Sequence, residues 1–272
     1  MRESLQPWFA KIIGPASAPA VVLLHAIATH GDMWAPQLAV WSQYYRLLIP
    51  DFPGHGNSPA ERGTRSLDDY ADRLLDCINR AGLNNVALVG LSFGGMVAQA
   101  FALRHPAELR ALVIADSLAK VSPEAIGIWE ERKKAAETRG MAAQVRATLE
   151  RWFTPNFAAR SPMILNWVGN MVESAQVRGY VAAITAIQEL NFQERLPRIN
   201  SPCLVVTGDS DSIVPPSVAN ATAAAIPGSE TLIIEDAAHL SNVERSESFT
   251  EGVGAFLGKH LTQPTTSRAV SP

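Results

Sequence analysis

Six short apolar runs, each ending at a polar residue or a glycine, restrict this 272-residue chain to a small number of folds. The runs are rich in valine, leucine and isoleucine and show no alternation of apolar and polar side chains. Such runs are typical of strands buried on both faces, as in a parallel sheet covered by helices. They lie at residues 20–25, 45–51, 85–90, 110–116, 203–209 and 231–236.

Helical patterns separate most of these runs, at residues 66–80, 93–104, 217–225 and 245–260. Alternating strands and helices predict an α/β fold in which right-handed crossovers connect parallel strands. We therefore expect a mostly parallel central sheet flanked by helices.

One long interval, residues 117–195, contains no strand pattern and predicts only helices, punctuated by proline and glycine. We interpret it as an all-helical cap inserted between two strands of the sheet. The expected division is a core at 1–118, the cap at 119–195 and the rest of the core at 196–261. A tail rich in proline, serine and threonine, 262–272, is expected to be disordered.

The composition excludes several classes of protein. Hydrophobic residues make up 47% of the chain and charged residues 18%, as in ordinary globular domains. A net charge of −3 gives no basic footprint for nucleic acid or for an anionic membrane. The spacing of Cys77 and Cys203 fits neither a disulfide framework nor a zinc site. We found no signal-peptide pattern and no apolar run of membrane-spanning length, so we expect a cytoplasmic protein.

A candidate nucleophile lies at the end of the third run, in the G-x-S-x-G sequence from Gly90 to Gly94. A buried strand leads into Ser92 and a helix leads out of it. A serine on such a sharp turn has a strained backbone and an exposed hydroxyl, close to the N–H groups of the helix N-terminus. The alternative is a glycine-rich turn whose serine only caps the helix; the motif alone would not exclude it, and the strand before it and the helix after it favour the nucleophile.

A serine hydroxyl needs a base to remove its proton, and the base needs an acid to orient it. His239 follows the last predicted strand by a short loop and is the candidate base. Asp211, beyond the penultimate strand, is the candidate acid. Asp209 is expected to shape the turn, and Asp116, at the end of another strand, is the main rival for the acid role.

Together these segments resemble the α/β-hydrolase superfamily over residues 8–260. The resemblance rests on "VVLLHAIATHGDMW", "LLIPDFPGHGNS", "LVGLSFGGMVAQ", "LVVTGDSDSIVPP" and "AAHLSNVE". Within the superfamily the chain is most similar to 3-oxoadipate enol-lactonases and related carboxylesterases, through "DMW", "RWFTP" and "DAAHLSNVE".

The resemblance assigns a role to the loop after the first run. It implies that the N–H groups of Ile27 and Phe93 form the oxyanion hole, and that His25 braces the loop. His30 would lie at the rim or surface. Many relatives have glycine where this chain has Ala26, so the loop is expected to differ locally. A metal site at the two histidines would need further ligands, and we found none in the sequence.

The implied activity is hydrolysis of a small-molecule ester or lactone through an acyl-enzyme on Ser92, without cofactor or metal. Arg151, Trp152 and Phe153 are the candidate substrate-binding residues in the cap. The other large apolar residues of the cap are expected mostly to pack its helices, and the charged run around residues 129–140 to form a solvated helix face.

Three alternatives stay open: a cofactor-free perhydrolase or haloperoxidase-like enzyme, a C–C bond hydrolase, and a hydrolase-fold ligand receptor. The oligomeric state does not follow from the sequence.

Overall fold

A seven-stranded sheet forms the centre of the molecule in the computed structural model, which describes residues 6–61 and 66–261. The strand order is β1-β3-β2-β4-β5-β6-β7; β1 is antiparallel to β3, and all other neighbouring strands are parallel. The expected α/β fold with a mostly parallel sheet is therefore confirmed. The strands are β1 Ala10–Ile13, β2 Ala20–Leu24, β3 Arg46–Pro50, β4 Val86–Leu91, β5 Leu109–Ala115, β6 Cys203–Gly208 and β7 Glu230–Ile234.

The six apolar runs correspond to β2–β7, and no apolar run predicts β1. All residues of β4 and β6 are buried, which explains their continuous apolar sequence. The edge strand β1 has no fully buried residue and carries Lys11, so it lacks the signal of a central strand. An edge strand needs only one paired side and tolerates such a sequence.

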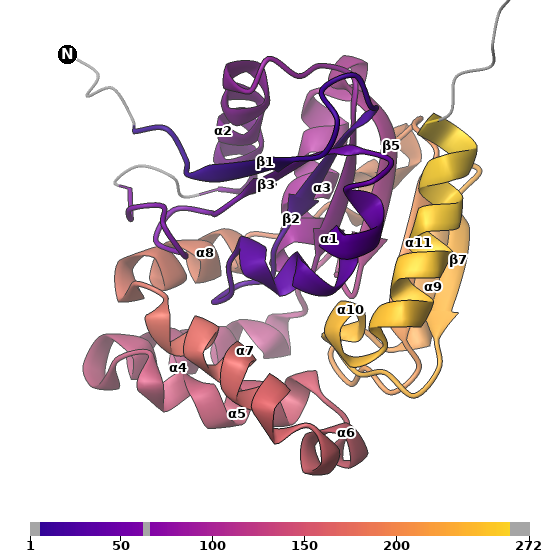
Figure 1. Ribbon diagram of the computed structural model, residues 1–272. Coiled ribbons are helices and arrows are strands. Elements are labelled where there is room, and N and C mark those ends of the chain that lie inside the picture. The colour runs from indigo at the N-terminus through magenta and orange to yellow at the C-terminus, as the bar shows by residue number, and fades with distance from the viewer. Residues whose placement is uncertain (1–5, 62–65, 262–272) are drawn as a thin grey trace, which may run out of the picture.

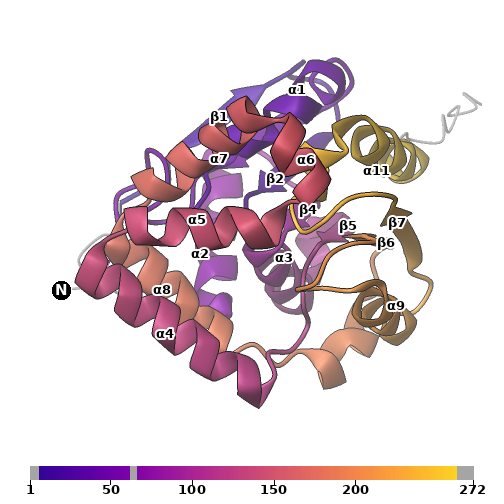
Figure 2. The ribbon, with the colours of Figure 1, turned by 90° about the horizontal axis from the view of Figure 1, so that it is seen from below.

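Helices cover both faces of the sheet (Figure 2). One face carries α1 (Ala35–Trp41) and α11 (Ser246–Leu261). The other carries α2 (Leu67–Arg80), α3 (Phe93–Arg104) and α9 (Pro216–Ala225). Helix α3 is apolar and buried around almost its whole circumference, as expected for a helix enclosed by other elements. The short helix α10 (Ser241–Glu244) and three 3-10 helices complete the described elements: η1 Gly31–Trp34, η2 Pro106–Glu108 and η3 Gln193–Arg198.

Five α-helices between β5 and β6 lie together beyond the carboxyl ends of the parallel strands (Figure 1). The segment that leads from the sheet into these helices lies beside the segment that leads back from them to the sheet. Lys120 and Asn191 form an antiparallel bridge, and Phe192 N–H donates to Ala119 O at 2.8 Å. The helices are α4 Pro123–Arg139, α5 Ala142–Trp152, α6 Pro155–Arg160, α7 Pro162–Ser174 and α8 Val177–Gln188.

Two further expectations concern membranes and the tail. Within residues 6–61 and 66–261, no helix has both the length and the apolar character needed to cross a bilayer. The tail expected to be disordered, 262–272, lies outside the described residues.

Candidate active site

The turn between β4 and α3 holds Ser92 in a conformation that few non-glycine residues adopt, with φ 55° and ψ −115°. Its N–H donates to the carbonyl of Ala115, at the end of β5, over 2.8 Å. The side chain is only 7% exposed. Strained backbone of this kind persists where neighbouring structure enforces it, and it is concentrated at functional sites.

The glycines around Ser92 are required by close backbone contacts. A Cβ on Gly90 would lie 2.3 Å from the carbonyl oxygen of Gly94, and a Cβ on Gly94 would lie 2.2 Å from that of Leu24. Neither distance is compatible with a side chain. The G-x-S-x-G sequence therefore allows α3 to pack directly against the carboxyl ends of β2 and β4.

Three side chains from distant parts of the chain meet at this turn. Nε2 of His239 lies 2.9 Å from the hydroxyl oxygen of Ser92, and its Nδ1 lies 2.8 Å from Oδ2 of Asp211. The other carboxylate oxygen, Oδ1, accepts the N–H groups of Ile213 at 2.7 Å and Val214 at 3.0 Å. These bonds fix the carboxylate, and a carboxylate at Nδ1 favours the tautomer whose Nε2 accepts the serine proton.

The surroundings of Asp211 favour its charged form. Burial opposes ionisation, but the charge of His239 and the hydrogen bonds from His239, Val214 and Ile213 outweigh it, so the pKa is lowered. Asp211 is 2% exposed and His239 also 2%. A buried, ionised carboxylate beside the imidazole stabilises the imidazolium that forms when the histidine accepts a proton.

The two other aspartates considered for the acid lie elsewhere. Asp209 is exposed, and its Oδ1 accepts from the hydroxyl of Ser210. Asp116 is fully buried, and its carboxyl group contacts Gly208 N–H and the Ser241 hydroxyl instead of the histidine.

The loop after β2 carries the first expected oxyanion-hole donor. Ile27 is 2% exposed, and within the described chain neither its N–H nor that of Phe93 donates to a hydrogen bond. His25 donates from Nδ1 to Ala26 O at 2.7 Å and accepts Phe52 N–H at Nε2 over 2.8 Å. With both nitrogens bonded, His25 ties the loop to the chain after β3.

Because Ala26 replaces the glycine of many relatives, the loop was expected to differ from theirs at this residue. The loop residue with positive φ is Ala28, at 61°, rather than Ala26. The side chain of Met33, which sequence reasoning left without a role, lies under the loop. Its sulfur accepts Ala26 N–H at 3.2 Å and the hydroxyl of Thr29 at 3.1 Å. Residue type alone gives no signal for such a contact.

The contacts of His25 are given above, and those of His30 are local to its own loop. His30 caps η1, where its Nδ1 accepts Asp32 N–H at 3.4 Å. Throughout residues 6–61 and 66–261, no group of three or more histidine, cysteine, aspartate or glutamate side chains is arranged to hold a metal ion.

Among the three candidate substrate-binding residues in the helical insertion, Trp152 forms a ring contact with the histidine. Its ring centroid is 6.4 Å from that of His239, and its carbonyl accepts Leu240 N–H at 3.1 Å. Phe153 is buried and stacks on Phe157 with centroids 5.2 Å apart. Arg151 is partly buried, one residue before Trp152.

The charged run in α4 departs from the expected solvated face at Arg132. Its guanidinium lies 4.5 Å from the ring centroid of Trp129 and 6.0 Å from that of Tyr180, and its Nε and Nη2 are buried without a hydrogen-bond partner. Next to it, Lys133 forms an ion pair at 2.7 Å with Glu130, three residues earlier in the helix. One apolar residue expected to pack, Met163, is instead 82% exposed.

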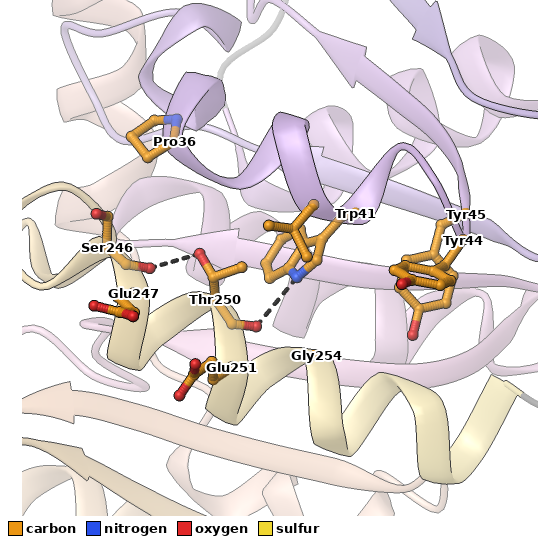
Figure 3. A pocket seen from close by; sticks show the side chains of 10 residues that line it. Pro36, Trp41, Tyr44, Tyr45, Ser246, Glu247, Thr250, Glu251 and Gly254 are labelled. Carbon is orange, nitrogen blue, oxygen red and sulfur yellow. Dashed lines mark hydrogen bonds between the residues drawn. The ribbon is translucent and has the colours of Figure 1, made fainter.

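A groove of about 550 Å³ lies between α1 and α11 (Figure 3), and Ser92 is not among the residues that line it. Trp41 forms part of its wall and donates from Nε1 to Thr250 O at 3.2 Å. Glu247 and Glu251 lie along the α11 side. Its lining residues include Ser246 and Thr250 but no histidine, so the groove lacks a serine–histidine–aspartate arrangement like that at Ser92.

Comparisons with known proteins agree with this geometry. Residues 19–246 match the family model described as the alpha/beta hydrolase fold. 3-Oxoadipate enol-lactonase 1 of Acinetobacter baylyi is 28% identical to this chain over 247 residues, which cover 91% of both chains.

Solved structures give the same result. The crystal structure of the enol-lactonase from Burkholderia xenovorans LB400 is 32% identical, has a TM-score of 0.88, and is matched over 92% of this chain and 96% of its own. A thermophilic esterase from Thermogutta terrifontis, determined with malate bound, is 29% identical with a TM-score of 0.88, over 93% and 94%. On the family match, the sheet order and the turn at Ser92, this chain belongs to the α/β-hydrolase fold family.

Proposed function

We propose that the protein is a serine hydrolase that cleaves a carboxylic ester or a lactone through an acyl-enzyme. The observation that supports this most directly is the connected series Asp211–His239–Ser92, with contacts of 2.8 and 2.9 Å. The family's enol-lactonase and esterase members, among the relatives above, are consistent with this substrate class.

In the proposed reaction the Ser92 oxygen attacks the substrate carbonyl while Nε2 of His239 takes the hydroxyl proton. Asp211 holds the imidazole in the required tautomer and stabilises its charge. The N–H groups of Ile27 and Phe93 donate to the oxyanion; each such donor contributes about 2.7–4 kcal/mol to transition-state stabilisation in comparable enzymes.

His239 then gives its proton to the leaving oxygen. It later removes a proton from the water that attacks the acyl-enzyme, and returns this proton to the Ser92 oxygen as the bond to the acyl group breaks. The products are an acid and an alcohol. With a lactone both stay in one molecule, so the net result is ring opening. Apart from the substrate and this water molecule, the proposed steps use only groups of the chain.

Arg132 and Arg151 support a more specific substrate, one that carries a carboxylate away from the reacting carbonyl. Burial and the nearby charge of Arg132 lower the pKa of Arg151, and within the described residues neither guanidinium forms an ion pair with a carboxylate. Thr148 is fully buried with an unpartnered hydroxyl, one helical turn before Trp152. Two cations that form no ion pair within the described residues, together with a buried hydroxyl that has no partner there, favour an anionic ligand.

The central test is covalent labelling. A fluorophosphonate probe should label wild type at Ser92 alone, and Ser92→Ala should lose labelling and hydrolysis while it keeps its melting temperature. Asp211→Asn should lower kcat by up to ~10⁴ because it favours the wrong histidine tautomer. Labelling of another serine would refute the assignment.

A substrate panel separates the alternatives. We expect hydrolysis of p-nitrophenyl acetate and of lactones to exceed both cleavage of a ring-fission diketone and peracid formation with hydrogen peroxide. Stoichiometric binding without turnover would instead indicate a receptor.

The carboxylate preference has its own test, with Arg146 as the matched control because it lies exposed on α5 and pairs with Glu150. Arg132→Gln should lower kcat/KM about 10- to 100-fold for a carboxylate-bearing lactone, and little for its uncharged methyl ester. Arg146→Gln should affect neither substrate.

A further inference from the structure

Asp116, the rival for the acid role, occupies an unusual position at the end of β5. Its side chain is fully buried and its backbone has a φ of 46°. The backbone is held there because its N–H donates to Val206 O, in β6, at 2.8 Å. A strained backbone and a buried carboxyl group both lower the stability of the fold unless other contacts compensate, so the contacts of Asp116 need an explanation.

Both oxygens of this carboxyl group contact segments that carry the triad residues. Oδ1 accepts the N–H of Gly208 at 3.1 Å, and Gly208 precedes Asp211 by three residues. Oδ2 lies 2.5 Å from the hydroxyl of Ser241, two residues after His239. The side chain of Asp116, directly after β5, thus joins the loop of the acid to the loop of the base.

The two loops also contact each other at this point. A Cβ on Gly208 would lie 2.1 Å from Ala237 O, and Ser210 N–H donates to Ala237 O at 2.9 Å. Movement of either loop relative to β5 would therefore change the distance between Asp211 and His239. Displacements of about 1 Å are known to cost such sites about 100-fold in rate.

The charge state of Asp116 matters because Asp211 is close enough to affect it. Burial and the charge of Asp211 raise the pKa of Asp116 well above its usual range, and the hydrogen bonds from Ser241 and Gly208 oppose this only in part. Among the described residues no lysine, arginine or histidine forms an ion pair with Asp116. The charged or titratable groups of the neighbouring loops that bear on it are Asp211 and, bonded to Asp211, His239.

We propose that Asp116 is a positioning residue that fixes the Asp211 and His239 loops to the end of β5 as a neutral carboxylic acid. In this form it supplies both contacts without placing a second negative charge beside Asp211. Its catalytic consequence rests on the proposed function, because it acts through the triad and does not touch the substrate.

Three variants test the contacts. In the proposed neutral form the O–H of Asp116 donates to the Ser241 oxygen. The NH₂ group of Asp116→Asn can take this role while its amide oxygen still accepts from Gly208, so kcat should stay within about 3-fold of wild type. Asp116→Leu loses both contacts and should lower kcat about 100-fold at unchanged KM. Ser241→Ala loses one contact, should lower kcat about 10-fold, and provides a readout even if Asp116→Leu does not fold.

The pH profile distinguishes a neutral from an ionised Asp116. The acidic limb of kcat/KM reports the histidine of the free enzyme. If Asp116 is neutral, the limb of Asp116→Asn coincides with that of wild type. If it is ionised, the asparagine removes a negative charge near His239 and moves the limb to lower pH by on the order of one unit.

A measurement independent of activity completes the test. With ¹³C-labelled aspartate, the carboxyl resonance missing from Asp116→Asn should have the chemical shift of a protonated acid at pH 7. An ionised resonance, a shifted limb, an Asp116→Asn variant slowed by about 1,000-fold, or a fully active Ser241→Ala would each overturn the proposal. Failure of Ser92 labelling would instead refute the proposed function and leave the resonance result intact.

Discussion

Three residues at the ends of neighbouring strands have positive φ although none is glycine: Ala28 at 61°, Ser92 at 55° and Asp116 at 46°. They follow β2, β4 and β5. Such conformations cost of order 1–3 kcal/mol each and persist only where surrounding bonds enforce them. The sequence predicted the turn at Ser92 because glycines flank it. Ala28 and Asp116 could not be predicted, since their conformations depend on tertiary bonds and not on residue type.

Two buried histidines near the oxyanion loop should make the protein sensitive to acid. Burial lowers the pKa of His25 and of His55 from 6.5 to about 3. In the unfolded chain both accept a proton near pH 6.5. As the pH falls from about 6.5 to about 3, the unfolded state therefore binds more protons, and stability falls by about 1.4 kcal/mol per unit for each histidine.

The variant His55→Gln should show a shallower loss of stability between about pH 6 and 4.5, measured by urea unfolding. His105→Gln is the matched control, because His105 is partly exposed and its Nε2 lies 2.8 Å from Oδ1 of Asp72. Equal slopes for wild type and His55→Gln would show that His55 is not held neutral.

Helix α10 connects the helical insertion to the loop of the candidate base. Glu244 is 5% exposed, and its carboxylate accepts the N–H and the hydroxyl of Thr154, at the start of α6, and the N–H of Ala238 at 2.9 Å. Ala238 immediately precedes His239. No sequence motif marked Glu244, because its partners come from two other segments.

Glu244→Gln should therefore destabilise the protein and slow the reaction. An amide has one acceptor oxygen where the carboxylate has two, so a buried donor is left unpaired at a cost of about 1–3 kcal/mol. We expect kcat to fall with little change in KM, as measured by steady-state kinetics alongside urea unfolding. Unchanged kcat and unchanged stability would show that this connection does not position the base.

Trp152 ends α5 beside the candidate base and provides a test of specificity at this junction. Its ring is 2% exposed and lies near His239, so it contributes both to packing and to the surroundings of the reacting group. If it contacts substrate, Trp152→Ala should change the ranking of kcat/KM among esters and lactones. A purely structural tryptophan would instead cost about 3–5 kcal/mol of stability with an unchanged ranking.

At the scale of the molecule, the sequence predicted the elements better than their contacts. Runs that are apolar on both faces gave six of the seven strands, because burial on both sides leaves a strong local signal. Asp211 and His239 could be predicted as a pair with Ser92, since the carboxyl ends of parallel strands meet at one edge. The contacts of Met33, Arg132 and Glu244 could not be predicted, because they form between segments that only the folded chain brings together.

The helical insertion is held to the core at two places far apart in the sequence. At one, Leu240 N–H donates to Trp152 O. At the other, Gln176 N–H donates to Gly54 O at 2.8 Å, just before α8 begins. There α8 packs against the loop after β3 so closely that a Cβ on Gly179 would lie 2.5 Å from Gly54 Cα. These two contacts with the core should keep the insertion in a defined position over the carboxyl ends of the strands.

Gly179→Ala tests the second attachment. The added methyl group would also lie 2.5 Å from Pro53 O, and both neighbours are backbone atoms that cannot rotate away. We expect α8 to move from the loop, at a cost of about 1–3 kcal/mol and a corresponding loss in melting temperature. KM should rise as well, because the displaced helix belongs to the insertion that carries the candidate substrate-binding residues.

Gly127→Ala is the matched control, because Gly127 lies within α4 and a Cβ there would meet nothing within 4 Å. Alanine in an exposed helix interior should stabilise the protein by about 0.5–1 kcal/mol and leave KM unchanged. A Gly179→Ala variant as stable and as active as Gly127→Ala would show that the insertion does not depend on this contact. A lower melting temperature with unchanged KM would confine its role to folding.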